Sequence, residues 1–165
     1  MNVLRMFKHL MLPDWWRHRA FSAEDLAAIG AEVGASEKSH RGELRFVVEA
    51  SLTVAALWRD QSARQRAAEV FAVERVWDTE ENSGILIYVQ LADRRVEILA
   101  DRGIATRVPQ AEWDAICRGM EQAFRAGQWR QGALAAVAHA GELLAENFPA
   151  GANNPNELPD APRVF

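Results

Sequence analysis

The chain has 165 residues and a mass of 18.4 kDa, a size that fits a single domain. Apolar residues make up 49% of it and charged residues 25%, so a buried core can form and wholesale disorder is excluded. The net charge of −4 argues against nucleic acid as a partner. The one cysteine, Cys117, excludes an internal disulfide and any all-cysteine metal site, and its place on an apolar helical stripe predicts an inert thiol.

The first 20 residues are basic and amphipathic, whereas the rest of the chain is acidic. Apolar residues recur at helical spacing from Val3 to Met11, and Pro13 ends this pattern. Five residues of this segment have the chemistry of a membrane interface: Phe7, Lys8, Trp15, Trp16 and Arg17. The alternative is a helix that packs on its own domain or on a partner subunit.

The sequence contains no apolar run of the length that a secretory signal or a membrane-spanning helix needs. We therefore expect a cytoplasmic protein, with peripheral association at the inner membrane if residues 1–20 bind lipid. A membrane surface is thus one expected partner of the chain.

Periodicity and turn signals divide residues 21–148 into helices and strands. Ser22 and Asp25 have the spacing of a capping box, which predicts a helix from there to about Gly34. The other expected elements are helices at 61–77, 109–127 and 128–148, and strands at 44–52, 85–91 and 96–101. Four of the six prolines follow residue 148, so we expect residues 149–165 to be extended or disordered and outside the core.

The order of these elements predicts how the strands run. The first two strands flank a helix, and such crossovers make parallel neighbours, whereas the short connection 92–95 allows only an antiparallel hairpin. The result is a small mixed sheet. Three loops, at residues 37–43, 78–83 and 101–103, should therefore meet at one edge of it.

That edge is rich in charged side chains. Crowded carboxylates attract a hard cation such as Ca²⁺ or Mg²⁺, and the candidate ligands are Asp78, Glu80 and Asp101. His40 is the candidate acid–base group, and Arg102 is the candidate holder of a phosphate. The alternative is that the acids are solvated loop positions beside the strands and that His40 caps a helix end.

The opposite edge is where open α/β sheets usually bind ligands, at the carboxyl ends of parallel strands. The sequence offers Glu49, Ser51 and the turn 93–95 there. This set is poorer in recognisable chemistry, so we favour the first edge.

Several motifs, taken in order, resemble the TPM domain family, from about Phe21 to the end of the chain. The motifs are Ser36–Glu43, Val76–Asn82 followed by Gly84–Tyr88, Ala100–Ile104, Phe124–Gly132 and Asn156–Asp160. The chain looks most like a short bacterial branch of this family without a transmembrane tail. The resemblance implies a three-layer α/β/α sandwich, with helices on both faces of the sheet.

The resemblance also implies two classes of function. Some relatives are described as acid phosphatases and some bind calcium, while others are accessory proteins in the assembly or repair of membrane complexes. Bacterial members often accompany membrane-anchored helical proteins of the LemA type, which makes such a protein a second expected partner. We therefore expect a membrane-associated accessory module, with a divalent-metal-dependent, phosphatase-like hydrolase as the alternative.

Overall fold

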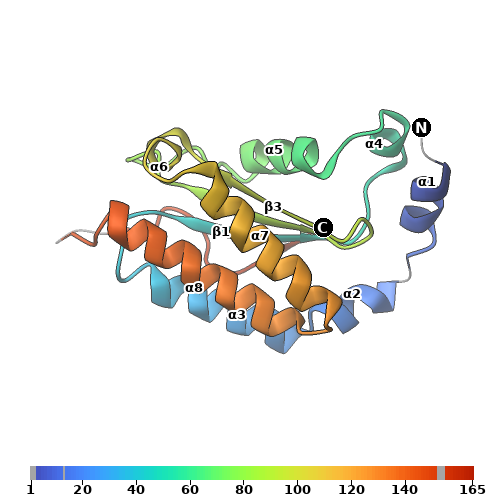
Figure 1. The fold of residues 1–165 in the computed structure, drawn as a ribbon, viewed down its shortest axis with the longest axis horizontal. Helices are drawn as coiled ribbons and strands as arrows, with labels where there is room; N and C mark the ends of the chain where they lie inside the picture. The colour runs from blue at the N-terminus through green and yellow to red at the C-terminus, as the bar shows by residue number, and fades with distance from the viewer. Residues whose placement is uncertain (1–2, 13, 152–154) are drawn as a thin grey trace.

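The computed structural model describes residues 3–12, 14–151 and 155–165, except for the side chains of Asp14 and Arg17. A sheet of four strands lies at the centre, in the order β3-β2-β1-β4 (Figure 1). The strands are β1 (Leu44–Glu49), β2 (Ile85–Gln90), β3 (Arg95–Ala100) and β4 (Arg163–Val164). β1 runs parallel to β2 and β4, and β3 runs antiparallel to β2, which confirms the predicted directions of the first three strands.

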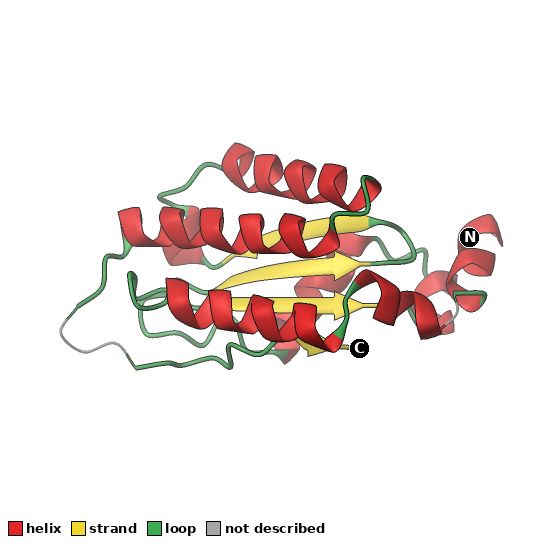
Figure 2. Ribbon diagram, turned by 90° about the horizontal axis from the view of Figure 1, so that it is seen from below, coloured by secondary structure: helices red, strands yellow, loops and turns green. Residues whose placement is uncertain are grey.

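Helices cover both faces of this sheet, so the predicted three-layer sandwich is confirmed. The helices are α1 (Val3–Leu10), α2 (Asp14–Ala20), α3 (Ala23–Ser36), α4 (Val54–Trp58), α5 (Ala63–Val73), α6 (Arg102–Ala105), α7 (Gln110–Arg125) and α8 (Trp129–Asn147). In Figure 1, α3, α7 and α8 lie on one face and α5 lies on the other. Figure 2 shows the long helices lying along the strands.

Local signals explain where these elements begin and why the central strands are apolar. The expected capping box at Ser22 and Asp25 is present, and a second one joins Ser62 and Gln65 at the start of α5. Every residue of β1 and β2 is buried, as expected of strands that are covered on both faces. A large core lies under α3, α7 and α8, and a smaller one lies under α5.

The prediction that residues 149–165 lie outside the core is wrong. Leu158 is buried in the smaller core, and Arg163 and Val164 pair with β1 as its outer neighbour. Buried Arg45 donates hydrogen bonds to the carbonyl oxygens of Pro159 and Ala161, at 2.8 and 2.6 Å. Proline lacks an N–H group but keeps its carbonyl, so a proline-rich segment can still satisfy a buried guanidinium.

Three short helices, α2, α4 and α6, have no counterpart among the predicted elements. Each is only four to seven residues long, which is too short for a helical period to show in the sequence. Thr53 caps α4, and Asp101 caps α6. In the described part of the chain, no helix has both the length and the apolar character needed to cross a bilayer.

Candidate functional site

The three loops that the sequence predicts at one edge do meet there. Because β1 and β2 run in the same direction and β3 runs back, the loop before β1, the loop before β2 and the end of β3 share an edge. The backbone N–H of Gly103 donates to the carbonyl of Asn82, and the guanidinium of Arg102 donates to the Asn82 side chain at 2.9 Å. We call this end of the sheet, where β1 and β2 begin and β3 ends, the amino edge; it lies at the left of Figure 1.

The predicted metal ligands do not converge at the amino edge. The side chains of Asp78 and Glu80 are exposed. The backbone N–H of Glu80 donates a hydrogen bond to the carboxylate of Glu157. Asp101 accepts a hydrogen bond from the N–H of Arg102 at the start of α6. Within the described residues, no three His, Cys, Asp or Glu side chains are grouped so that they could hold a metal ion.

Two carboxylates at this edge each keep one oxygen apart from the hydrogen-bond network, although Glu81 pairs with Arg41 at 2.9 Å through its other oxygen. Oδ2 of Asp101 and Oε2 of Glu81 are buried, and neither has a hydrogen-bond partner among the described residues. The backbones of the two segments are in close contact, since a Cβ on Gly103 would lie 2.4 Å from the carbonyl oxygen of Glu81. The sequence places Glu81 at this edge too, but nothing in the pattern favours it over Glu80 as a ligand, so it is not among the predicted ligands.

His40 lies beneath the amino edge, not on it. Its side chain is fully buried, and its Nδ1–H donates to the carbonyl oxygen of Gly42 at 2.9 Å. Burial lowers the pKa of His40, and the bond to Gly42 offsets only part of this effect, so the ring is neutral at pH 7. A solute at the edge would not reach this ring without a rearrangement.

Two other buried carboxyls, Glu37 and Glu43, organise the amino edge. Glu43 accepts the backbone N–H groups of Glu157 and Leu158, so it fixes the C-terminal segment against β1. Burial raises the pKa of Glu43, although these two bonds lower it in part. Burial, together with the neighbouring Glu43, raises the pKa of Glu37 to about 8. The acidic character of this edge therefore serves the fold.

The other end of the sheet, which we call the carboxyl edge, carries α1. This helix turns Arg5 and His9 inward: Arg5 donates to Asp93 in the β2–β3 turn at 2.7 Å, and His9 contacts the same carboxylate at 3.1 Å. The N–H of Leu52 donates to Nδ1 of His9, so Nε2 carries the proton and donates to Asp93. Met6 packs on Leu52 and α4.

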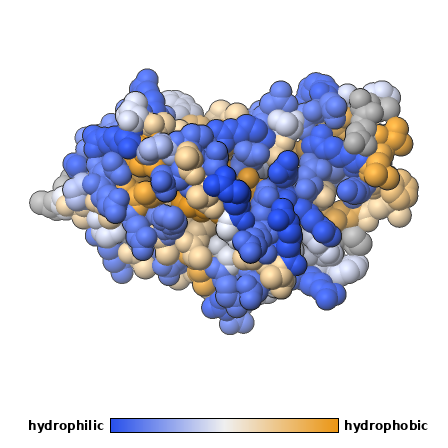
Figure 3. All heavy atoms as spheres, viewed as in Figure 1, coloured by the Kyte–Doolittle hydropathy of each residue, from blue (hydrophilic) through white to orange (hydrophobic). Residues whose placement is uncertain are grey.

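The apolar side of α1 faces outward. Five large apolar side chains on and just after the helix are more than half exposed: Val3, Leu4, Phe7, Leu10 and Met11. Figure 3 shows apolar surface at the end of the molecule where Figure 1 places α1. An amphipathic helix that packs on its own domain normally does the reverse, with its apolar side inward.

The five residues predicted to face a membrane divide into three groups. Phe7, Lys8 and Trp15 are exposed. Trp16 instead packs edge to face on Trp129, with ring centroids 5.7 Å apart. The side chain of Arg17 lies outside the described residues.

Cys117 is half-buried, and burial raises the pKa of its thiol to about 12, which fits the expected inert role.

Comparison with known families, solved structures and curated proteins identifies the family of the chain. The family model of the TPM domain matches residues 17–143. The BA42 protein of the psychrophilic bacterium Bizionia argentinensis is similar in structure, with a TM-score of 0.76, 28% identity and coverage of 87% of this chain and 94% of that chain. The N-terminal domain of a protein from P. gingivalis shares the fold, with a TM-score of 0.56, 22% identity and coverage of 78% of each chain. The search of curated proteins finds no match. The family model spans more than half of the sequence, so the chain belongs to the TPM domain family.

Proposed function

We propose that this TPM domain is an accessory module that binds an anionic membrane surface through α1. The observation that carries the proposal is the inverted packing of this helix. Arg5 and His9 fasten its polar side to Asp93, and the apolar side is left to solvent. Exposing that many large apolar groups is costly unless a second surface covers them.

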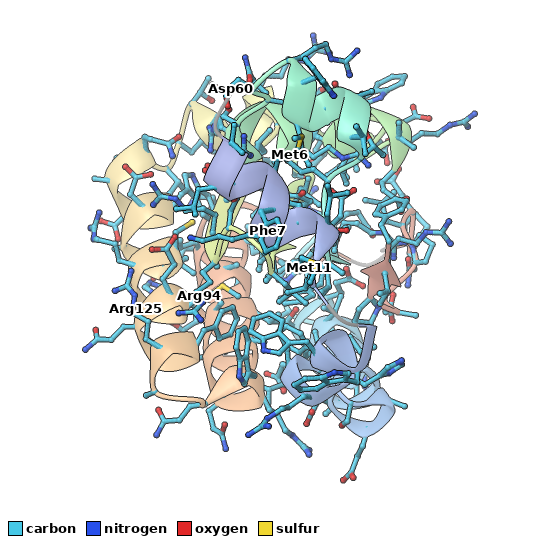
Figure 4. All side chains as sticks on the ribbon, turned by 90° about the vertical axis from the view of Figure 1, so that its right-hand side faces the viewer. Met6, Phe7, Met11, Asp60, Arg94 and Arg125 are labelled. Atoms are coloured by element: carbon cyan, nitrogen blue, oxygen red, sulfur yellow. The ribbon has the colours of Figure 1, made fainter. Side chains whose placement is uncertain are left out.

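The chemistry beside α1 favours a bilayer as that surface. Lys8 and Arg94 are exposed, and both line a surface hollow with Phe7 and Met11. Figure 4 looks onto this end and shows Phe7, Met11, Arg94 and Arg125 on the same side of the molecule. Apolar insertion contributes about 0.8 kcal/mol per buried CH₂, and each basic residue near an anionic leaflet adds about 1 kcal/mol.

Trp58 and Val54 extend this surface onto α4, and both are about half exposed or more. Tryptophan is enriched at the boundary between lipid headgroups and acyl chains. An accessory protein held there would present the rest of its domain to proteins anchored in the same membrane.

Vesicle binding of two matched variants tests this proposal. Leu4→Asp combined with Phe7→Asp changes the outer side of α1, and Val73→Asp changes an equally exposed apolar residue on α5. We expect the unaltered protein to co-float with phosphatidylglycerol vesicles and to bind phosphatidylcholine vesicles weakly. The α1 variant should lose about tenfold or more in vesicle affinity, while the α5 variant keeps it. Equal binding by all three proteins would rule out α1 as the anchor.

A second candidate function is a divalent-cation site at the amino edge that supports hydrolysis of phosphate esters. The partnerless oxygens of Glu81 and Asp101 favour it, and Arg102 is next to them for an anionic group. Asp101→Asn keeps the cap of α6, because Asn is as good a cap as Asp, but removes a charge. We expect Ca²⁺ or Mg²⁺ to shift the amide resonances of residues 79–84 and 101–103 in the unaltered protein only. Absence of such shifts, or metal-dependent hydrolysis that survives the substitution, would contradict this site.

A further inference from the structure

A cavity of about 140 Å³ lies at the carboxyl edge, on the face of the sheet that α7 and α8 cover. It lies between the end of β2, the β2–β3 turn, the last turns of α7 and the start of α8, and Trp16 of α2 forms one wall. Ligands of open α/β sheets usually bind at this edge. The cation site discussed above does not use this cavity, whereas the proposed membrane surface meets its rim at Arg94 and Arg125.

The interior of the cavity is mainly apolar and aromatic, and Gln90 is the polar residue of the sheet that lines it. Phe124 and Trp129 line it and stack on each other, with ring centroids 4.6 Å apart, and Trp16 meets Trp129 edge to face. Val89 and Leu91 of the sheet complete the apolar lining. An engineered cavity of about 150 Å³ holds benzene, so this one has room for a group of that size and no larger.

The rim of the cavity is cationic. Arg94, Arg95 and Arg125 line it together with a single acid, Glu121. Glu121 pairs with Arg125 at 3.3 Å and more loosely with Arg95 at 3.8 Å, whereas Arg94 forms no ion pair within the described residues. The rim therefore has an excess of positive charge, and guanidinium groups bind carboxylates through paired hydrogen bonds.

We propose that this cavity binds a small aromatic carboxylate, with the ring between Trp16, Phe124 and Trp129 and the carboxylate at the arginine rim. The apolar interior excludes a free inorganic anion as the preferred ligand, and the excess of arginines disfavours a neutral or cationic one. The proposal does not rest on membrane binding, because no residue of the outer side of α1 lines the cavity.

Three probes that separate the aromatic ring from the negative charge test the ligand chemistry, with the full chain in solution and no vesicles present. Benzoate has both the ring and the charge, benzyl alcohol has only the ring, and acetate has only the charge. We expect benzoate to shift the indole N–H resonances of Trp16 and Trp129 saturably, with a Kd of about 1 mM, as suits so small a ligand. Benzyl alcohol should bind at least tenfold more weakly, and acetate should not saturate. Benzoate that fails to saturate, or benzyl alcohol that binds equally well, overturns the proposal.

Substitutions of opposite expected effect test the rim. Arg94→Asn suits the left-handed backbone at that position (φ 53°), and Arg125→Gln keeps a helix former; each should weaken benzoate binding about fivefold. Glu121→Gln should strengthen it severalfold, because it releases two arginines and still accepts the N–H of Val96. Arg118→Gln, on the same helix but away from the cavity, is the charge-matched control and should leave the Kd unchanged. If Glu121→Gln and Arg94→Asn both leave the Kd unchanged, no arginine rim recognises the ligand and the proposal fails.

Discussion

The two edges of the sheet handle buried carboxyl groups in opposite ways. At the amino edge, Glu37 and Glu43 lie near each other, and burial raises the pKa of both although each accepts a hydrogen bond from a backbone N–H group. At the carboxyl edge, burial also works against the charge of Asp93, but hydrogen bonds from His9 and Arg5 outweigh it and hold the pKa of Asp93 well below its usual range. The acid that has Arg5 and His9 beside it is thus the one whose pKa is lowered, whereas burial raises the pKa of the other two.

The contrast teaches how this small domain divides its polar groups. At the amino edge, Glu43 binds the C-terminal segment through backbone N–H groups. At the carboxyl edge, Asp93 binds Arg5 of α1, a helix whose outer side is apolar. The edge with the more conspicuous charges is therefore the more structural one. Four predictions test this division: three expected losses of stability, from the largest to the smallest, and then one expected gain.

Arg45→Met should cause the largest loss of stability. Arg45 is buried, pairs with Glu74 at 2.7 Å and donates to two carbonyls of the C-terminal segment. Its removal leaves the Glu74 carboxylate largely buried and unfastens the segment, so the free energy of unfolding should fall by about 3 kcal/mol. Urea denaturation measures this. Arg118→Met, at an exposed arginine, should change the free energy of unfolding by less than about 0.5 kcal/mol. A similarly small change for Arg45→Met would show that the contacts of Arg45 do not stabilise the fold.

Glu49→Gln tests the carboxyl edge with a loss of about 2 kcal/mol. Glu49 is buried at the end of β1, accepts two hydrogen bonds from the guanidinium of Arg66 and one from the hydroxyl of Tyr88. Glu69→Gln removes a more exposed partner of the same Arg66 and is the matched control. Denaturation should show a small effect for the control. Equal losses for both variants would mean that burial does not strengthen the Glu49 pair.

Asp93→Asn should lower the free energy of unfolding by about 1–2 kcal/mol at neutral pH, because Arg5 and His9 lose a charged acceptor. A carboxyl with a lowered pKa stabilises the fold above its ordinary pKa, and this contribution is lost as the pH falls toward the folded-state value. The difference between the variant and the unaltered protein should therefore shrink below about pH 4. A difference that stays constant from pH 7 to pH 3 would show that the charge of Asp93 is not what fastens α1.

Glu37→Gln should change stability in the opposite direction. The pKa of Glu37 is raised to about 8, so the folded state binds more protons than the unfolded state between the two values. Stability is therefore lost as the pH rises from about 4.5 to 8, and Gln, which cannot ionise, removes this loss. We expect Glu37→Gln to gain stability over the unaltered protein by about 1.4 kcal/mol for each pH unit between about pH 5 and pH 8, measured by thermal denaturation. A variant that is less stable at pH 8 would show that the charged form is the favoured one.

The elements that the sequence predicts well are those whose signal is local. Strand β2 is apolar at five of its six positions, and the capping box at Ser22 and Asp25 is a short-range pattern. The directions of the first three strands follow from connection length alone. The predicted helix 61–77 is longer than α5, because Trp77 and other apolar residues after Val73 continue the pattern past the end of the helix.

What the sequence does not predict depends on contacts between distant segments. Strand β4 has two residues and exists only because β1 has an open side beside it. The cavity at the carboxyl edge joins a turn, two helix ends and a tryptophan from α2, a helix with no sequence signal. The turn 93–95 is the part that sequence analysis does identify, and it ranks below the amino edge because single-residue chemistry cannot show which residues enclose a space.

The position of β4 has a consequence for how the chain matures. β1 is synthesised early, yet the strand that completes its outer side is translated only after every helix of the sandwich. A nascent chain that ends within α8 thus displays a row of unsatisfied amide and carbonyl groups, which is a template for mispairing with another polypeptide. Ribosome-bound intermediates of this length should be good clients for a chaperone until Arg163 and Val164 can pair with β1.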